Sequence, residues 1–257
     1  YGGQLQDMAV PGVAPEGKVR VDYEAVPVRF KDGTEVQLRK PLLQITQLGY
    51  GPMHPDTRFS ARIAPPMIGL GLLEAIPEEA ILANAAANKN DADINGRPNR
   101  VWDDAQQKTV LGRFGWKAGQ PNLNQQNVHA FSGDMGLTTS LRPFDDCTSA
   151  QTDCLAAPNG NGPDGEPEVS DNILRLVEFY TRNLAVPARR DVDSPQVLAG
   201  KNLFYQAGCV SCHTPKFTTS ANAAEPELAN QVIYPYSDLL LHNMGPGLAD
   251  NRTEFAA

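Results

Sequence analysis

Cys209-Val210-Ser211-Cys212-His213 is the stretch of this 257-residue chain that says most about how it folds. Two thiols three positions apart can each form a thioether to one vinyl group of a single porphyrin, and the adjacent histidine can then bind the iron. The alternatives are a dithiol redox pair or half of a zinc site. A zinc site needs further ligands, yet the chain contains no second C-x-x-C and no H-x-x-x-H. The motif therefore predicts covalent haem c, held by Cys209, Cys212 and His213.

Composition limits the class of protein. Hydrophobic residues make up 41% of the chain, enough for one large domain or two modest ones, and 22 glycines with 21 prolines predict many loops and short elements. The net charge of −8, without a basic patch, argues against a nucleic-acid partner. No apolar run reaches the length of a membrane span. Because the first residue is Tyr1 rather than methionine, we expect a processed protein or a fragment.

The other two cysteines point to the compartment. Cys147 and Cys154 bracket a polar segment and could close a small disulfide loop, although a pair of free surface thiols is the alternative. Covalent haem and an even number of cysteines both suit an oxidising environment. We therefore expect a periplasmic or otherwise exported bacterial protein.

Regular elements can be placed from periodicity and capping residues. Residues 18–40 alternate as strands do, and Asp32-Gly33 is a hairpin signal, so a small antiparallel sheet is expected there. Helices are expected from Pro77 to Ala87, from near Asn122 past Phe131, after the cap Ser170, and after Ser194-Pro195. The proline- and charge-rich stretch 187–193 is typical of a linker. These elements predict a mainly α, loop-rich chain with a small antiparallel β insertion.

A haem iron with six ligands needs an axial partner for His213. His242 and Met244 lie downstream, and Gly245-Pro246-Gly247 favours irregular chain around the methionine. A thioether ligand raises the iron potential, and we choose Met244 over the alternative of a core methionine that fills a gap. His242 is better explained as a hydrogen-bonded neighbour. Weaker candidates, relevant to a second haem, are His54, His129 and Met135.

One segment resembles the opening of a calcium-binding loop. Asp91, Asp93 and Asn95 alternate before Gly96, as oxygen ligands do in an EF-hand. The closing glutamate is missing, because Trp102 occupies position twelve, although the following aspartates could substitute. A surface turn held by side-chain hydrogen bonds explains the same residues equally well.

Several further segments together resemble a known family. They are Arg62 to Pro66, Ile68 to Ile76, Gly112 to Ala118, Asp134 to Gly136 and Ser237 to Gly245. In combination they resemble the di-haem oxidoreductase family, often labelled thiol oxidoreductase and related to bacterial di-haem cytochrome c peroxidases. Moreover, the residues from Gly200 to Cys209 resemble the N-terminal helix of cytochrome c domains, which crosses another helix at a glycine.

The resemblance implies an organisation for the chain. Residues 1–60 would be a β-rich segment, 61–190 the helical remainder of a first cytochrome c-like domain, and 191–257 a truncated second one carrying the haem motif. Such proteins carry two C-x-x-C-H motifs, and this chain has only the second. The first is expected before Tyr1 and a closing segment after Ala257.

The resemblance also implies roles for particular residues. His213 would be the proximal ligand of the C-terminal haem and Met244 its distal ligand. Trp116 would bridge two haems, against the alternative of a core aromatic. Basic side chains would pair with haem propionates, against the alternative of solvated surface charge; these are Arg62, Arg113 and Lys117. Related peroxidases hold calcium between their domains, which favours the loop at Asp91.

The functional expectation is an electron-transfer oxidoreductase of di-haem peroxidase type that takes electrons from a small redox partner protein and reduces peroxide. Glu74 is a conceivable acid for that chemistry. The alternative is a cytochrome module that carries electrons without catalysis. A third possibility is a haem-dependent enzyme that oxidises a partner protein.

Overall fold

The structure of the protein, a computed structural model, describes residues 1–88, 90–91 and 94–252. Its strands are β1 (Lys18–Arg29), β2 (Glu35–Thr46), β3 (Arg100–Asp103), β4 (Lys108–Leu111), β5 (Phe217–Thr218) and β6 (Val232–Ile233). Its helices are α1 (Leu70–Glu74), α2 (Glu78–Ala87), α3 (Leu123–Met135), α4 (Thr152–Ala156), α5 (Asp171–Asn183) and α6 (Pro195–Gln206), with 3-10 turns η1 (Cys209–Ser211) and η2 (Pro226–Leu228).

The expectation of a mainly α chain with cytochrome c-like domains is wrong. Among the described residues, 26% are helical and 16% are in strands, all in small antiparallel sheets. The helices are short because glycine or proline follows closely on several of them, and long irregular connections join them. Gly200 is not a helix crossing either: no described atom lies within 4 Å of a Cβ built on it, and α6 packs mainly against η1.

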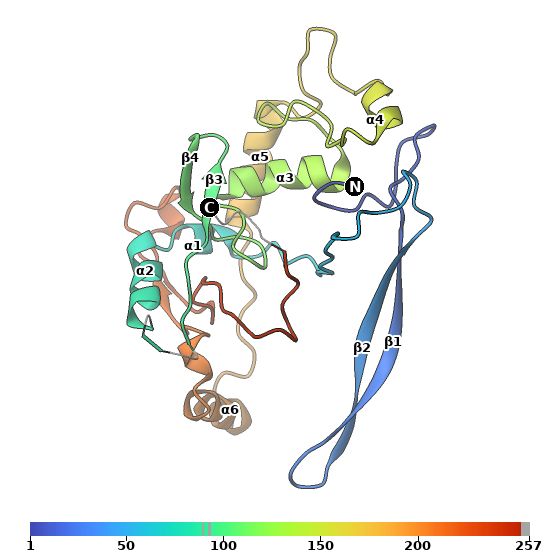
Figure 1. Ribbon diagram of the computed structural model, residues 1–257. Helices are drawn as coiled ribbons and strands as arrows, with labels where there is room; N and C mark the ends of the chain where they lie inside the picture. The colour runs from blue at the N-terminus through green and yellow to red at the C-terminus, as the bar shows by residue number, and fades with distance from the viewer. Residues whose placement is uncertain (89, 92–93, 253–257) are drawn as a thin grey trace.

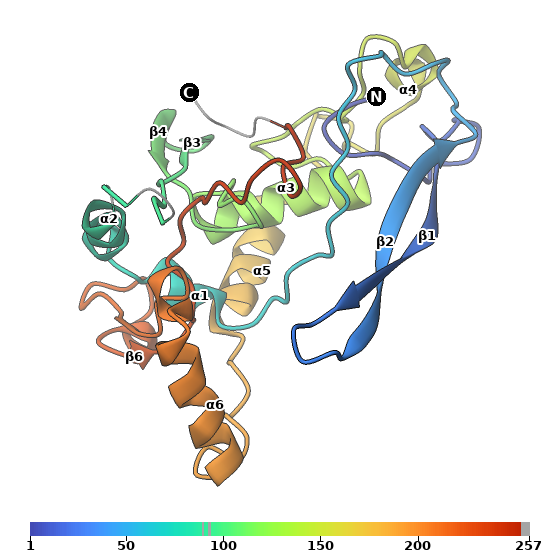
Figure 2. The ribbon, with the colours of Figure 1, turned by 60° about the horizontal axis from the view of Figure 1, so that its bottom comes forward.

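Three helices form the centre of the molecule (Figures 1 and 2). α3 packs against α5, and α1 crosses α5 where Gly71 allows close approach: a Cβ there would lie 2.2 Å from the carbonyl oxygen of Arg182. The buried core is divided into small clusters, as expected for short elements. The largest cluster joins α2 to β4 and the β5–β6 pair, through Ile76, Ile81, Leu111, Phe217 and Ile233.

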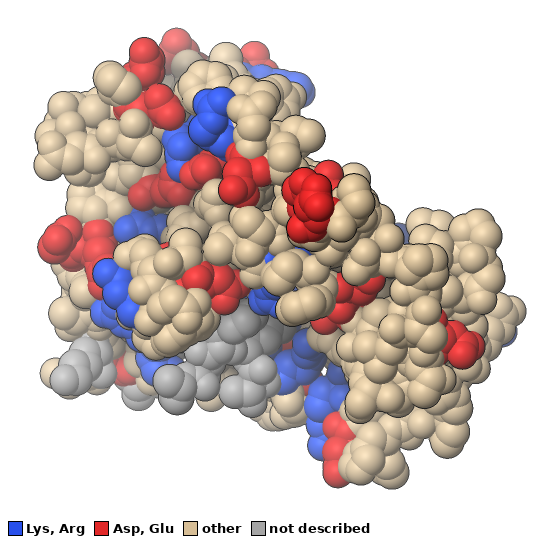
Figure 3. Space-filling model, turned by 90° about the horizontal axis from the view of Figure 1, so that it is seen from above, with Lys and Arg blue, Asp and Glu red and all other residues tan. Residues whose placement is uncertain are grey.

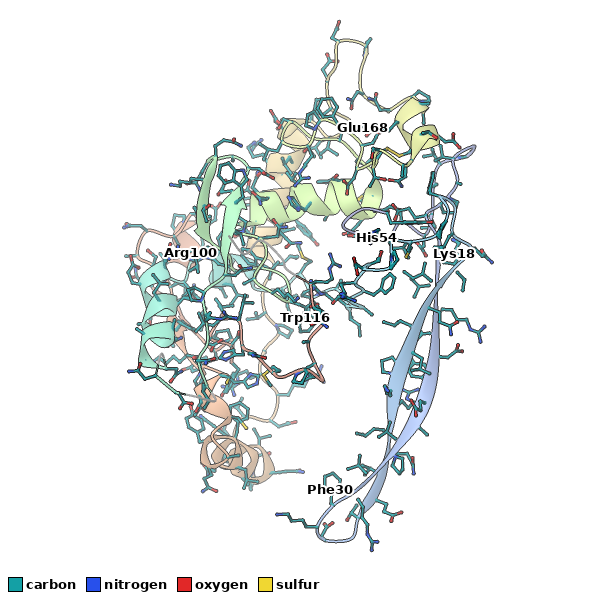
Figure 4. The ribbon with its side chains drawn as sticks, in the orientation of Figure 1. Lys18, Phe30, His54, Arg100, Trp116 and Glu168 are labelled. Atoms are coloured by element: carbon teal, nitrogen blue, oxygen red, sulfur yellow. A yellow bond between two sulfur atoms is a disulfide. The ribbon has the colours of Figure 1, made fainter. Side chains whose placement is uncertain are left out.

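The hairpin β1–β2 extends away from this centre as a two-stranded ribbon (Figures 1 and 2). The expected hairpin at Asp32-Gly33 is confirmed: Gly33 has φ 89°, and the Asp32 carboxylate accepts a hydrogen bond from the Thr34 amide at 2.9 Å. The two apolar runs expected before this turn form one continuous strand. Figure 4 shows its length from Lys18 near the body to Phe30 at the tip.

A second hairpin, β3–β4, was missed by the sequence reasoning. Asp103 is fully buried at its turn, where its carboxylate accepts from the amides of Ala105 and Gln106 and from the side chain of Asn122. Asp103, suggested as a substitute calcium ligand, is therefore a turn-forming carboxylate in this structure.

Helix starts follow their capping residues. The side chains of Asn122, Ser170 and Ser194 each accept a hydrogen bond from an amide in the first turn of α3, α5 and α6. α2 also spans Glu78 to Ala87 as predicted. No helix in the described part of the chain is long and apolar enough to cross a membrane.

The expected disulfide between Cys147 and Cys154 is confirmed. Buried Glu16 connects its loop to the N-terminal segment, because its carboxylate accepts from Gln151 at 2.9 Å and from the Gln6 amide at 2.8 Å. The N-terminal segment and the disulfide loop, far apart in the sequence, thus meet at one carboxylate beside the base of the hairpin.

Candidate haem site

The C-x-x-C-H motif lies on one tight turn directly after α6. Gly208, with φ 75°, ends the helix and lets the chain enter η1. The His213 amide donates to the carbonyl of Cys209 at 2.9 Å, which closes the turn. Cys209 is exposed and Cys212 partly buried, and both are free thiols. Both sulfurs and the imidazole are therefore carried by a single turn of backbone.

The imidazole of His213 is oriented by the chain that follows β6. Its Nδ1 lies 3.0 Å from the carbonyl oxygen of Tyr236, and the ring of Phe204 packs against both side chains. A backbone carbonyl at Nδ1 fixes the tautomer with hydrogen on that nitrogen. This leaves Nε2 as the nitrogen suited to an iron ligand.

The segment from Tyr236 to His242 adopts an uncommon backbone conformation. Tyr236 has φ 51° and Leu239 φ 59°, in the left-handed region that bulky residues rarely occupy. The Asp238 amide between them donates to the carbonyl of Cys212 at 3.2 Å. Backbone strain of this kind often accompanies functional sites. Here it allows one short segment to contact both His213 and Cys212.

His242 lies between an acid and a thiol. Its Nε2 is 2.7 Å from a carboxylate oxygen of buried Asp238, and its Nδ1 is 4.0 Å from Sγ of Cys212. Burial raises the pKa of the Cys212 thiol, and the charges of Asp238 and Asp91 raise it further. The structure thus shows His242 as a hydrogen-bonded neighbour of the motif.

Residues 84–88 and 94–97, which precede the motif by more than 100 positions, also lie close to it or to the segment that covers it. The side chain of Asn88 donates to the carbonyl of Ser211 at 3.4 Å, and Arg97 forms a backbone bridge with Leu241. Gly96 permits this approach, since a Cβ there would lie 2.8 Å from the ring of His242. The loop predicted to bind calcium is therefore a neighbour of the haem motif.

Calcium itself finds little support in that loop. The carboxylate of Asp91 accepts from the Ile94 amide at 2.8 Å, as in the surface turn considered as the alternative. Asp93 lies outside the described residues. Elsewhere in the described chain, no three His, Cys, Asp or Glu side chains are grouped to hold a metal ion. The assignment of Asp91, Asp93 and Asn95 to calcium stays a prediction.

Met244 lies beyond His242 on an exposed stretch. Its side chain is 68% exposed, and Gly245 beside it has φ 82°. This is the irregular, glycine-containing chain that the sequence indicated. Its role as the second axial ligand stays a prediction.

The basic residues chosen as propionate partners have protein partners in this structure. Arg62 and Lys117 both bind the carboxylate of Asp250, at 3.2 and 2.6 Å. Arg113 donates to the carbonyl oxygens of Leu73 and Ile76, and burial lowers the pKa of its guanidinium.

Two further candidates also have structural contacts. Trp116 is 64% exposed and donates from Nε1 to the carbonyl of Ile63 (Figure 4). Glu74, the conceivable acid, accepts from the Leu123 amide at the start of α3 and binds Arg182 at 2.8 Å. Its carboxylate is therefore occupied in holding α1, α3 and α5 together.

The weaker axial candidates lie in other surroundings. His129 contacts Gln120, Asp104 and Arg142, and burial, with the charge of Arg142, lowers the pKa of its imidazole. His54 is exposed on the connection between the hairpin and α1 (Figure 4), and Met135 is 63% exposed. Their association with a second haem stays a prediction.

The sequence reasoning missed three residues that shape this site: Tyr236, Asp238 and Asn88. Asp238 was within reach, since a carboxylate four residues before His242 in an otherwise apolar stretch needs a partner. Tyr236 contributes through its carbonyl, which no side-chain pattern reveals. On the face shown in Figure 3, basic side chains lie beside acidic ones.

Two free thiols and a carbonyl-oriented imidazole on one turn are the donor set that a haem protein presents to its porphyrin. The chain belongs to the family described as di-haem oxidoreductase, putative peroxidase, whose model matches residues 3–257. No curated protein and no solved structure matches it. It is thus a haem-containing oxidoreductase by family.

Proposed function

We propose that Cys209 and Cys212 would hold a c-type haem through thioethers and that Nε2 of His213 and Sδ of Met244 would bind its iron. This haem would supply electron transfer from a small redox partner protein to a second haem of the same di-haem protein, whose open iron position would serve peroxide reduction. The bound haem supplies the redox chemistry. The chain supplies attachment, orientation of the imidazole and partial exclusion of water.

The observation that carries the proposal is the contact between Nδ1 of His213 and the Tyr236 carbonyl, on the turn that carries both thiols. A hydrogen bond at that nitrogen raises the basicity of the other one and holds the ring in place. Membership of a di-haem oxidoreductase family supports the same cofactor. The Cys147–Cys154 disulfide supports an exported, oxidising compartment.

Mass spectrometry of the denatured chain tests the attachment. After production in cells that mature c-type cytochromes, we expect a mass increase of one haem per chain, stable to acid and organic solvent. Cys209→Ala with Cys212→Ala removes that increase. The matched control, Cys147→Ser with Cys154→Ser, keeps it because those thiols form the disulfide. A denatured wild-type chain with its unmodified mass contradicts the proposal.

The axial role of Met244 has its own test. Met244→Ala is expected to lower the midpoint potential of the haem, because a thioether ligand stabilises the reduced iron. Met135→Ala is the matched control, since both methionines are similarly exposed. Equal potentials in all three proteins assign the second axial position to another group.

The alternative, an electron carrier without catalysis, is favoured by one observation. Glu74, the acid suggested by the sequence, is bound to Arg182 and the Leu123 amide. Rapid mixing of the reduced protein with peroxide separates the two functions. In the protein that carries both haems, peroxide reduction predicts oxidation that depends on peroxide concentration and a high-spin ferric species at the second haem, because two ligands from this chain keep the first one low-spin. A carrier remains low-spin and reacts only with its protein partner.

A further inference from the structure

The outer edge of β1 has no neighbour in the described chain. β1 and β2 form a two-stranded sheet, and in both ribbon views the first part of β1, next to the base of the hairpin, lies on the side of the ribbon away from the body (Figures 1 and 2). An unpaired strand edge offers backbone donors and acceptors to any strand that can lie beside it. A two-stranded ribbon is also only marginally stable alone, so a third strand stabilises it.

The phase of the hairpin shows which backbone groups face that edge. The Phe30 amide donates to the Thr34 carbonyl at 2.8 Å, and these two residues follow the register of the hairpin. Hydrogen-bonded pairs alternate with non-bonded pairs along an antiparallel ladder. The backbone amides and carbonyls of even-numbered residues of β1 therefore bond to β2, and those of odd-numbered residues point to the unpaired edge. Pro27 and Pro41 agree with this phase, because both occupy outward positions where no ladder amide is needed.

The first seven residues of β1 are complementary to themselves. Lys18-Val19-Arg20-Val21-Asp22-Tyr23-Glu24 carries bases before Val21 and acids after it. When two copies pair antiparallel about Val21, Lys18 stands opposite Glu24 and Arg20 opposite Asp22, twice each. Val21 then meets its own copy, and Val19 meets Tyr23.

The same register satisfies the outward backbone groups. Val19, Val21 and Tyr23 are odd-numbered, so their amides and carbonyls form the hydrogen-bonded pairs of the new ladder. The charged residues fall at the other pairs, where facing side chains approach most closely. Pro27 lies beyond the new ladder, opposite residue 15, which precedes the strand. The proposed ladder therefore loses no hydrogen bond through the lack of a backbone amide at Pro27.

Side-chain exposure fits the same arrangement. Val19, Val21 and Tyr23 are large hydrophobic residues that are 54%, 42% and 58% exposed. Within one chain, Arg20 contacts Asp22 at 3.0 Å, but both side chains are more than 40% exposed. Exposed ion pairs contribute little, so exchanging this contact for one across the interface costs little.

We propose that two copies of this chain associate through β1, forming a four-stranded antiparallel sheet in the order β2-β1-β1-β2 with its two-fold axis at Val21. β1 is the better edge of the hairpin for this association. On β2, Pro41 interrupts the outward amides in the second half of the strand. The two bodies then lie on either side of the shared sheet.

A charge exchange on the haem-loaded chain tests the proposal. Sedimentation or light scattering is expected to give twice the chain mass for the wild type. Arg20→Asp places acids opposite acids, and Asp22→Arg places bases opposite bases, so each alone weakens the dimer by about tenfold or more. An equimolar mixture of the two variants regains the dimer mass, and so does the double variant R20D/D22R, because opposite charges face each other again.

A pair of proline variants tests the edge itself. Val21→Pro removes an outward amide at the two-fold axis and is expected to give a monomer. Gln37→Pro removes an outward amide from β2 and leaves the dimer intact. Circular dichroism confirms that both variants remain folded. A monomeric wild type, a mixture that stays monomeric, or a dimer unaffected by Val21→Pro overturns the proposal, and the free edge would then suit a strand of another protein.

Discussion

Several donors converge on the carboxylate of Asp250. It accepts from Lys117 at 2.6 Å, from Arg62 at 3.2 Å and from the Arg252 amide at 3.0 Å. The hydrogen bond from Lys117 is the largest reason that the pKa of Asp250 lies far below its usual range. Two of the three basic residues that the sequence assigned to propionates thus bind the segment around Asp250 to the body.

Removing that carboxylate gives a prediction that depends on pH. A carboxyl group with a depressed folded pKa stabilises the fold above its unfolded pKa, about 4, and this stabilisation is lost as pH falls below that value. We therefore expect Asp250→Asn to lower the free energy of unfolding by about 1 kcal/mol at neutral pH, since all three side chains are partly exposed. The difference from wild type should shrink between about pH 4 and pH 2.

Urea unfolding at several pH values measures this effect. Asp56→Asn is the matched control, because Asp56 is 83% exposed and contacts only His54 among the ion pairs of the described chain. Its stability should follow that of the wild type at every pH. A difference for Asp250→Asn that is independent of pH contradicts the ionic explanation.

At the scale of elements, glycine decides how closely helices approach. Gly71 on α1 lies against the backbone of α5, whereas Gly200 on α6 faces open space in the described structure. The sequence pattern suggested a close approach at Gly200, because that glycine precedes the haem motif on a helix resembling that of cytochromes. A glycine in a helix shows that close contact is allowed, and only the tertiary structure shows whether contact is made.

Alanine at these two glycines should change stability in opposite directions. Gly71→Ala places a Cβ 2.2 Å from a backbone oxygen that cannot move alone, so a loss of about 2–3 kcal/mol is expected. Gly200→Ala meets no atom within 4 Å and removes backbone freedom from the unfolded chain. It should therefore stabilise by about 0.5–1 kcal/mol. Midpoints of urea unfolding for the two variants check both signs, and destabilisation by Gly200→Ala would show that its helix face is covered in solution.

At the scale of the whole molecule, long-range polar contacts add to the stability that the divided apolar core provides. Glu16 joins the N-terminal segment to the disulfide loop, and Glu74 joins α1 to α3 and α5. Small clusters of buried apolar residues leave more of the stability to such contacts. The disulfide between Cys147 and Cys154 adds a covalent constraint to these contacts.

Opening the disulfide should lower the stability of the chain. Its cysteines are seven residues apart, and a loop of that size corresponds to about 2 kcal/mol of lost unfolded-state entropy. The variant Cys147→Ser with Cys154→Ser should therefore unfold at a lower urea concentration than the wild type. A thiol reductant should bring wild type to the same midpoint and leave the variant unchanged. A reductant that shifts both proteins equally would assign its effect to another group.

Sequence reasoning succeeded where a local rule decides the structure. The caps Ser170 and Ser194, the turn at Asp32-Gly33 and the disulfide all follow from residues within one turn or one short loop. It failed on the β3–β4 hairpin and the overall fold class, because those depend on burial of Asp103 and on packing between distant segments. At the haem site, the motif itself was evident, but the carbonyl of Tyr236 carries no signal in the sequence.

The segment that covers Cys212 has a consequence for how the protein is assembled. The Asp238 amide binds the backbone carbonyl of Cys212 and the His242 ring lies 4.0 Å from its sulfur, while Cys209 remains open to solvent. Cys212 is partly buried and the ring of His242 lies beside its sulfur, so a bulky porphyrin could not reach this sulfur in the folded chain unless the segment that carries His242 moved first. We therefore expect the pigment to be attached during biosynthesis before the residues after β6 adopt their final position, so that this segment folds last.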